Sequence, residues 1–215
     1  MSQENRFIYR VKYTKGEKVK YISHLDFLRS VNRSFKRGKI PVKYSNGFNP
    51  HVLLNIALPC PVGVSSVCEL LDIELYEPMD TNEIKERLNN SLPVGIKALE
   101  VSKRGDGKDF FEISSALYEI EFKSQKEVDI EKFIAEPEFI IEKKSKRGMK
   151  EVNIKDFVHS IDITQATGSV YKINTVIDAG AKSNLKSELL LGAMEKYFDA
   201  AFYDIHTQRK EIYFD

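Results

Sequence analysis

Four cations recur at helical spacing between Ser23 and Gly38. Residues three and four positions apart are neighbours on a helix, so like charges at this spacing repel by a few tenths of a kcal/mol a pair. An anionic partner would relieve this repulsion, whereas the alternative is a basic face that contacts only solvent. The cations are Arg29, Arg33, Lys36 and Arg37 on the helix and Lys18, Lys20, Lys39 and Lys43 beside it.

A turn rich in asparagine and aromatic residues follows this basic segment. Gly47 and the asparagines tolerate positive φ and can present backbone N–H groups to an anion, while the rings offer faces on which a base or a flat ligand stacks. Asn-Gly and Asn-Pro also form ordinary turns, with Phe48 as a core residue, so both interpretations stay open. The turn comprises Tyr44, Ser45, Asn46, Gly47, Phe48, Asn49, Pro50 and His51.

Two histidines near this segment, His24 and His51, have a side-chain type suited to general acid–base chemistry, because the unperturbed pKa of histidine is about 6.5. With Asp26, and a cysteine, they form a candidate metal-ligand set. The two-residue spacing of His24 and Asp26 suits one helix face less well than a spacing of four. The plain alternative is that Asp26 completes a helix capping box with Ser23. We therefore predict no metal, no cofactor and no assigned catalytic residue.

Acidic residues follow the basic region, with seven carboxylates from Glu69 to Glu86. They reverse a balance of twelve lysines and arginines against two acids between Arg6 and Lys43. Such charges usually cover the outer face of a strand and a helix, and this is our interpretation. The alternative is a docking surface for a basic partner.

The elements that position these residues follow an α+β pattern. Alternating residues predict a strand from Phe7 to Tyr13, and helical periodicity predicts a helix from Leu25 to Gly38. The predicted order over residues 1–104 is β-α-β-β-α-β, the ferredoxin-like plan. The other predicted elements are strands at Val42 to Tyr44, Val67 to Tyr76 and Ile96 to Val101 and a helix that Asp80 or Thr81 caps, and an apolar run covers Val52 to Leu58.

The pattern restarts after a polar, turn-prone connection, and a second domain is predicted over residues 116–215. We expect two tandem ferredoxin-like (βαββαβ) units, the second irregular because of insertions near Ile161 to Gly168. The predicted strands are Ala116 to Phe122, Phe139 to Glu142, Glu151 to Ile154, Val170 to Ile177 and Ile205 to Phe214, and the helices are Asp129 to Ala135 and Leu185 to Phe198.

Composition narrows the class of protein. The chain has 215 residues, of which 42% are hydrophobic and 30% charged, as expected of a globular protein with a packed core. No apolar run approaches the roughly 20 residues that span a bilayer, and polar residues occupy the N-terminal stretch where a secretory signal needs apolar ones. We expect a cytoplasmic protein, not a membrane protein, with Cys60 and Cys68 reduced.

Three strings resemble a known family: Tyr21 to Asp26, Phe35 to Val42 and Tyr44 to His51. They are similar to the radical-SAM-linked protein family, a domain of unknown function encoded beside, or fused to, cobalamin-type radical-SAM proteins. The resemblance implies a bacterial accessory component with a radical-SAM protein as its partner. Two cysteines cannot hold a site-differentiated iron–sulfur cluster, so the chain is not expected to be the radical enzyme.

Together these features predict an accessory protein, more a binder than an enzyme, that binds RNA or another anionic substrate for the partner. Cations would contact phosphates, and the turn would contact a nucleotide or the partner. The alternative is a metal-independent endoribonuclease of RAMP-like architecture, with His24 and His51 as acid and base. The predicted ligand-binding residues are Lys20, His24, Arg29, Arg33, Arg37, Tyr44, Ser45, Asn46, Gly47, Phe48, Asn49 and His51.

Overall fold

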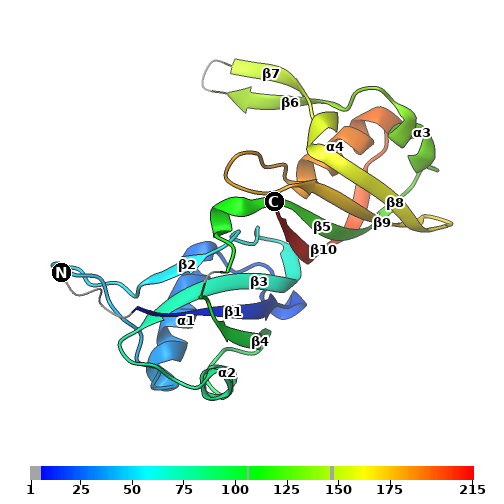
Figure 1. The fold of residues 1–215 in the computed structure, drawn as a ribbon. Helices are drawn as coiled ribbons and strands as arrows, with labels where there is room; N and C mark the ends of the chain where they lie inside the picture. The colour runs from blue at the N-terminus through cyan, green and yellow to red at the C-terminus, as the bar shows by residue number, and fades with distance from the viewer. Residues whose placement is uncertain (1–5, 106, 146–147) are drawn as a thin grey trace. The chain divides into compact units, whose positions relative to one another are not determined.

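Each half of this mixed α+β protein contains four strands that pair in an antiparallel arrangement (Figure 1). The computed structural model describes residues 6–105, 107–145 and 148–215. The halves form two compact units, Met1–Phe110 and Phe111–Asp215. Among the described residues, no helix combines the length and the apolar character that crossing a bilayer requires.

The first unit has a four-stranded antiparallel sheet in the order β4-β1-β3-β2. Its helices follow β1 and β3 in the chain, so the element order is β-α-β-β-α-β as predicted. The expected strand at 42–44 is reduced to isolated bridges at Val42 and Tyr44. The elements are β1 (Phe7–Lys15), the short 3-10 helix η1 (Glu17–Val19), α1 (His24–Arg37), β2 (Leu54–Ile56), β3 (Val64–Leu75), α2 (Thr81–Asn89) and β4 (Ile96–Lys103).

Both helices of this unit contribute to one core. Alternate residues of β1, such as Tyr9 and Val11, are buried together with Val31 and Phe35 of α1 and Ile84 of α2. Each such burial stabilises the fold by about 1.5–3 kcal/mol. Because side chains alternate along a strand, the intervening residues of β1 and β3 lie on the opposite face of the sheet.

The ends of α1 have local causes. The Ser23 hydroxyl oxygen accepts a hydrogen bond from the Asp26 backbone N–H at 3.2 Å, which confirms the predicted cap. Gly38 ends the helix where α2 approaches closely. A Cβ there would lie 2.9 Å from the Arg87 carbonyl oxygen, so only glycine fits without a shift of the backbone.

The second unit has a four-stranded antiparallel sheet in the order β10-β5-β9-β8 and a separate two-stranded ribbon, β6-β7. When the strands of each four-stranded sheet are counted along the chain, both sheets have the order fourth, first, third, second. The elements are η2 (Phe110–Glu112), which begins at the last residue of the first unit, then β5 (Ile113–Ser124), α3 (Ile130–Ala135), β6 (Ile140–Ser145), β7 (Gly148–Asn153), η3 (Lys155–Phe157), β8 (Val158–Thr167), β9 (Val170–Asp178), α4 (Ser187–Phe198) and β10 (Phe202–Phe214).

Two parts of this unit differ from the prediction. The residues expected to be an irregular insertion, 161–168, lie mostly in strand β8, which pairs with β9. The β6-β7 ribbon, predicted to supply two strands of the sheet, stays outside it. β8 is an edge strand and mostly exposed, so it lacks the apolar alternation by which strands are recognised in a sequence.

Candidate functional site

Two cations on α1 are exposed and unpaired. The side chains of Arg33 and Lys36 make no hydrogen bond or ion pair with any residue that the structure describes. They lie three positions apart, on the face of α1 that points away from the buried Val31 and Phe35. These two side chains are therefore available to an anion without the loss of an internal contact.

Three of the other predicted cations, Arg29, Arg37 and Lys20, have partners within the chain. Arg29 pairs with Asp26 at 3.0 Å, on the exposed surface of the helix. Arg37 donates to the Ser34 hydroxyl at 3.1 Å and to the Ser91 carbonyl oxygen, which ties α1 to the end of α2. Lys20 is buried and pairs with Glu17 at 2.8 Å. The predicted basic face is thus smaller than the sequence indicated.

The asparagine-rich turn is the end of a hairpin that we call the 44–52 hairpin. A bridge joins Tyr44 to Val52, and the Ser45 N–H donates to the His51 carbonyl oxygen at 2.8 Å. The Ser45 hydroxyl accepts from the His51 N–H at 3.1 Å and contacts its Nδ1 at 2.8 Å. These bonds fix the base of the hairpin, so its tip is presented in a defined position.

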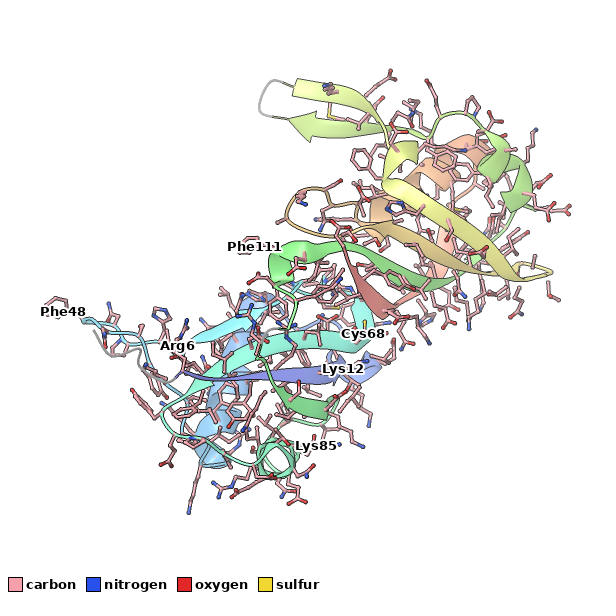
Figure 2. The ribbon with its side chains drawn as sticks, viewed as in Figure 1. Arg6, Lys12, Phe48, Cys68, Lys85 and Phe111 are labelled. Carbon is pink, nitrogen blue, oxygen red and sulfur yellow. The ribbon has the colours of Figure 1, made fainter. Side chains whose placement is uncertain are left out.

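The tip of the 44–52 hairpin is exposed. Phe48 has a fully accessible side chain, so it is not a core residue, and Figure 2 shows it extending away from the sheet. Asn46 and Asn49 beside it are also exposed. Gly47 has φ of 124°, a conformation that a residue with a side chain rarely adopts. An exposed ring between two carboxamides offers a stacking face and polar groups to a ligand.

His24 and His51 lie at opposite ends of the first sheet. His24 lines a small cavity with Lys15, the last residue of β1, at the end of the sheet where β3 begins. His51 lies in the hairpin whose Tyr44 N–H donates to the Tyr76 hydroxyl, just after β3 ends. At about 3.3 Å a residue, these ends are roughly 30 Å apart. The structure does not bring the two histidines together as an acid and base for one phosphodiester.

The last turn of α1 lies at the same end of the sheet as the 44–52 hairpin. The chain leaves α1 at Arg37 and reaches Val42, which bridges to Leu75 at the end of β3. Arg37 and Tyr44 are seven positions apart, and such a segment spans at most roughly 25 Å. Arg33 and Lys36 are therefore within reach of one ligand that also contacts the hairpin.

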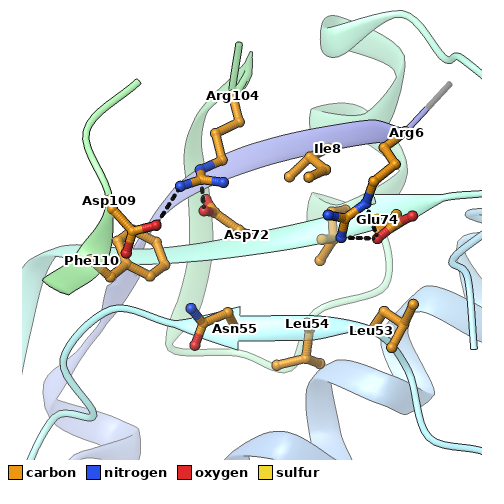
Figure 3. Close-up of a pocket in the computed structure, with 11 residues that line it drawn as sticks. Arg6, Ile8, Leu53, Leu54, Asn55, Asp72, Glu74, Arg104, Asp109 and Phe110 are labelled. Atoms are coloured by element: carbon orange, nitrogen blue, oxygen red, sulfur yellow. Dashed lines mark hydrogen bonds and ion pairs between the residues drawn. The ribbon is translucent and has the colours of Figure 1, made fainter. Parts of the chain in front are cut away.

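A pocket of about 260 Å³ lies at the base of the hairpin, on the sheet face away from the helices (Figure 3). No sequence pattern predicted this pocket. Residues that pair across neighbouring strands form its floor. Ile8 of β1 pairs with Glu74 of β3, and Asn55 of β2 pairs with Asp72 of β3. The lining residues are Arg6, Ile8, Leu53, Leu54, Asn55, Asp72, Ile73, Glu74, Arg104, Asp109 and Phe110.

Carboxylates interpreted from sequence as surface charges are buried. Asp72, in the pocket, accepts two hydrogen bonds from Arg10, at 2.8 and 2.9 Å, and pairs with Arg104 at 3.2 Å. Glu74 is buried in the same pocket and Glu69 is buried on the other face of β3, so the interpretation was wrong for these three acids. For Asp72, the signal that could have revealed this was Arg10 between the apolar Tyr9 and Val11 of β1, which requires an acid on the neighbouring strand.

Glu74 connects the pocket to the hairpin. Arg6 donates to Glu74 at 2.7 Å, and Lys43, next to Tyr44, pairs with the same carboxylate at 3.3 Å. The hydrogen bond from Arg6 lowers the pKa of Glu74, and Lys43 adds to this against the opposing effect of burial. Glu74 therefore stays ionised. Its carboxylate lines the pocket and also binds Lys43 at the base of the hairpin, so it links the two.

The described part of the chain contains no group of three or more His, Cys, Asp or Glu side chains placed to hold a metal ion. Cys60 is half-buried and Cys68 buried, and both are free thiols. The candidate site consists of Arg33, Lys36, the 44–52 hairpin and the pocket at its base.

Comparison with known proteins gives one family match. A family model described as "Uncharacterized protein conserved in bacteria (DUF2344)" matches residues 8–187. None of the curated proteins matches the chain.

Two solved structures resemble the chain at low identity. A chain in the "Crystal Structure of a Cbf5-Nop10-Gar1 Complex" has 11% identity and a TM-score of 0.43, over 98% of this chain and 59% of that chain. This chain thus spans little more than half of that one. The "Crystal Structure of an Unknown Protein from Galdieria sulphuraria" has 10% identity and a TM-score of 0.28, over 95% of this chain and 99% of that one.

Proposed function

The chain belongs to the DUF2344 family of uncharacterized proteins conserved in bacteria, and we propose that it is a non-catalytic accessory protein that binds RNA or another anionic substrate for a partner radical-SAM enzyme. One observation carries the proposal. Arg33 and Lys36 are unpaired at the end of α1 that adjoins the exposed 44–52 hairpin.

The two parts of this surface suit the two parts of a nucleic-acid strand. Phosphates carry the charge that Arg33 and Lys36 would neutralise, and such contacts position a strand without reading its sequence. Unpaired bases expose flat faces, and Phe48 offers the ring on which one would stack. Asn46 and Asn49 lie where a base edge would then be placed. RNA in an unpaired conformation is the ligand that uses both parts.

Salt dependence tests this proposal. We expect a fluorescently labelled single-stranded RNA to bind with an affinity that falls steeply as salt rises, because each neutralised phosphate releases a counterion. Replacing both cations, in Arg33→Glu with Lys36→Glu, should lower the affinity and flatten the slope of log affinity against log salt by about two contacts.

The matched control reverses two exposed cations of β4, in Lys97→Glu with Lys103→Glu, for the same change of net charge. β4 is the sheet edge opposite β2, which the hairpin adjoins. Equal losses in both double variants would show a nonspecific effect of net charge. A flat salt response in the unmodified protein would refute the proposal.

The radical-SAM part of the proposal rests on the resemblance of the strings at Tyr21, Phe35 and Tyr44. Co-expression of the protein with the neighbouring radical-SAM protein, followed by size-exclusion chromatography, tests it directly. Co-elution that survives nuclease treatment is the expected result. Two separate peaks at high protein concentration would remove the partner from the proposal and leave the RNA contact to be judged by itself.

The fold supports a finer assignment as well. We infer that each unit is a ferredoxin-like domain, placed at residues 1–104 and 116–215, and that the second is irregular because the β6-β7 ribbon is inserted after α3. The equal strand order of the two sheets supports this inference. Expression of residues 1–110 alone would test it, since an independent domain should give a cooperative unfolding transition.

A further inference from the structure

The pocket at the base of the 44–52 hairpin has ends of different chemistry. Figure 3 shows Asn55 and Asp109 beside Phe110 at one end, and Arg6 beside Glu74 at the other. Asn55 is exposed, and the Arg6 side chain is 63% exposed although it donates to Glu74. One end thus presents hydrogen-bonding groups that include acceptors, and the other presents a cation with room for an anion.

Apolar side chains line the space between these ends. Ile8 comes from β1, Leu53 directly precedes β2, and Leu54 is the first residue of β2. Asp72 and Glu74, which mark the two ends on β3, are two residues apart, a distance of about 7 Å. The pocket therefore suits a ligand that carries N–H donors at one end and negative charge at the other, with a body of modest polarity between them.

We propose that this pocket binds one nucleotide, with the base edge at Asn55 and Asp109, the base face against the apolar residues and the phosphate at Arg6. Nucleobases have apolar faces and polar edges, and arginine is well suited to phosphate. Asp109 accepts from Arg104 at 2.8 Å and keeps further lone pairs, and Asn55 adds a carboxamide, so a ligand with N–H donors gains contacts at this end that a simple carboxylate or inorganic anion does not. A cationic ligand would meet Arg6 and Arg104.

The charge balance of the pocket agrees with this ligand. The carboxylates of Asp72 and Glu74 are already bound by arginines of the same unit, so they form a neutralised floor. Arg6 has further N–H groups beyond the two that reach Glu74. A phosphate can bind there while the ion pair persists, because Lys43 also contacts Glu74.

This inference deepens the proposed function, on which it rests, by naming the unit of RNA that enters the fold. The hairpin leads directly into the pocket, since the Leu53 N–H donates to the Lys43 carbonyl oxygen at 2.8 Å. A strand stacked on Phe48 would reach the pocket with a neighbouring nucleotide. The pocket would then hold one base out of the stack, as proteins that read unpaired RNA do.

Titration of the full chain with adenosine 5′-monophosphate tests the inference. We expect the backbone amide signals of residues 53–56 and the side-chain amide of Asn55 to shift in nuclear magnetic resonance spectra. Asn55→Leu should weaken binding roughly fivefold, the effect of one lost hydrogen bond, and Arg6→Gln roughly tenfold, the effect of a lost charged one. Lys43 should keep Glu74 paired in the second variant.

The matched control is Asn82→Leu, which changes an exposed asparagine on α2, on the other side of the sheet. It should bind the nucleotide as the unmodified chain does. If inorganic phosphate gives the same shifts with the same affinity, the pocket reads no base and the inference is overturned. An equal loss in Asn55→Leu and Asn82→Leu would overturn it too.

Separate results distinguish this inference from the proposed function. Binding of labelled RNA without any binding of the nucleotide would overturn the pocket assignment and leave the RNA surface intact. Binding of the nucleotide without any binding of RNA would support the pocket assignment and refute the proposed function. Shifts confined to residues outside 53–56 would place the nucleotide elsewhere and overturn the pocket assignment.

Discussion

The two sheets share a strand order but carry charge differently on the face away from their helices. In the first unit, the paired side chains of Arg10 and Asp72 are 15% and 10% exposed. In the second unit, Lys172 and Glu119 form a pair at 3.1 Å whose side chains are about twice to three times as exposed, at 30% and 29%. The same architecture thus holds a buried ion-pair network in one unit and a half-exposed pair in the other.

The difference comes from the segment that follows β4. Arg104 and Asp109 pair at 2.8 Å, and the guanidinium of Arg10 lies 4.3 Å from the centre of the Phe110 ring. This segment covers part of the sheet, so the charges beneath it lose solvent and require partners. An uncovered sheet face needs no such network. The two units therefore differ in the burial of charge and not in strand order, and the buried charges line the pocket of the first unit.

Breaking the buried pair should have the largest effect. Asp72→Asn leaves Arg10 partly buried without a compensating charge and leaves Arg104 with Asp109 alone, so we expect the free energy of unfolding to fall by about 3–5 kcal/mol. Glu119→Gln should cost about 1 kcal/mol or less, because half-exposed pairs are solvated and screened. Urea unfolding followed by amide signals of β1 and β5 would separate the two units. Equal losses would contradict the comparison.

Removal of the exposed ring at the hairpin tip should come next in size. Phe48→Ala should weaken the binding of single-stranded RNA by about 1–3 kcal/mol, the contribution of one stacked base. Its stability should stay within about 0.5 kcal/mol, because the ring contacts solvent. Tyr203→Ala, on β10 of the second unit, is the control, and it should leave RNA affinity unchanged. A stability loss in Phe48→Ala would show that the ring is structural.

Removal of a helix cap should lower the stability of both units by a similar amount, in contrast to removal of a charged partner in the sheet. The side chain of Ser23 caps α1, and the side chain of Asp129 caps α3 by accepting from the Lys132 N–H at 3.0 Å. Replacement of either by alanine should cost about 1 kcal/mol, measured by urea unfolding. Similar losses would show that the units differ in buried charge and not in local helix stability. A negligible loss in Ser23→Ala would contradict this.

The smallest expected effect is on the pH dependence of the free energy of unfolding. Arg6 lowers the pKa of Glu74, so the folded state holds this proton less tightly than the unfolded chain does. The resulting stability is present above the unfolded pKa of about 4.3 and is lost as the pH falls through the lower folded pKa. Glu74→Gln should therefore reduce the acid sensitivity of the first unit, measured by urea unfolding from about pH 6 to about pH 3. An unchanged pH profile would contradict the link.

Sequence patterns located most of the elements in the first unit. Apolar periodicity and the Ser23–Asp26 cap placed α1 within two residues of its observed start, because helix formation depends on neighbours three and four apart. The same reasoning missed β8, whose pairing with β9 supplies the order that its own side chains do not signal. It also left Phe48 undecided between core and surface, since composition alone cannot measure exposure.

What the sequence determined by itself was local: the helix with its cations, the hairpin-forming turn and the alternation of β1. Only the tertiary structure decided which charges meet. Arg10 and Asp72 are 62 positions apart and become partners through the register of β1 on β3. The pairing of strands places distant residues on one face, and covering that face removes water, so the pocket and its ion pairs exist only in the folded chain.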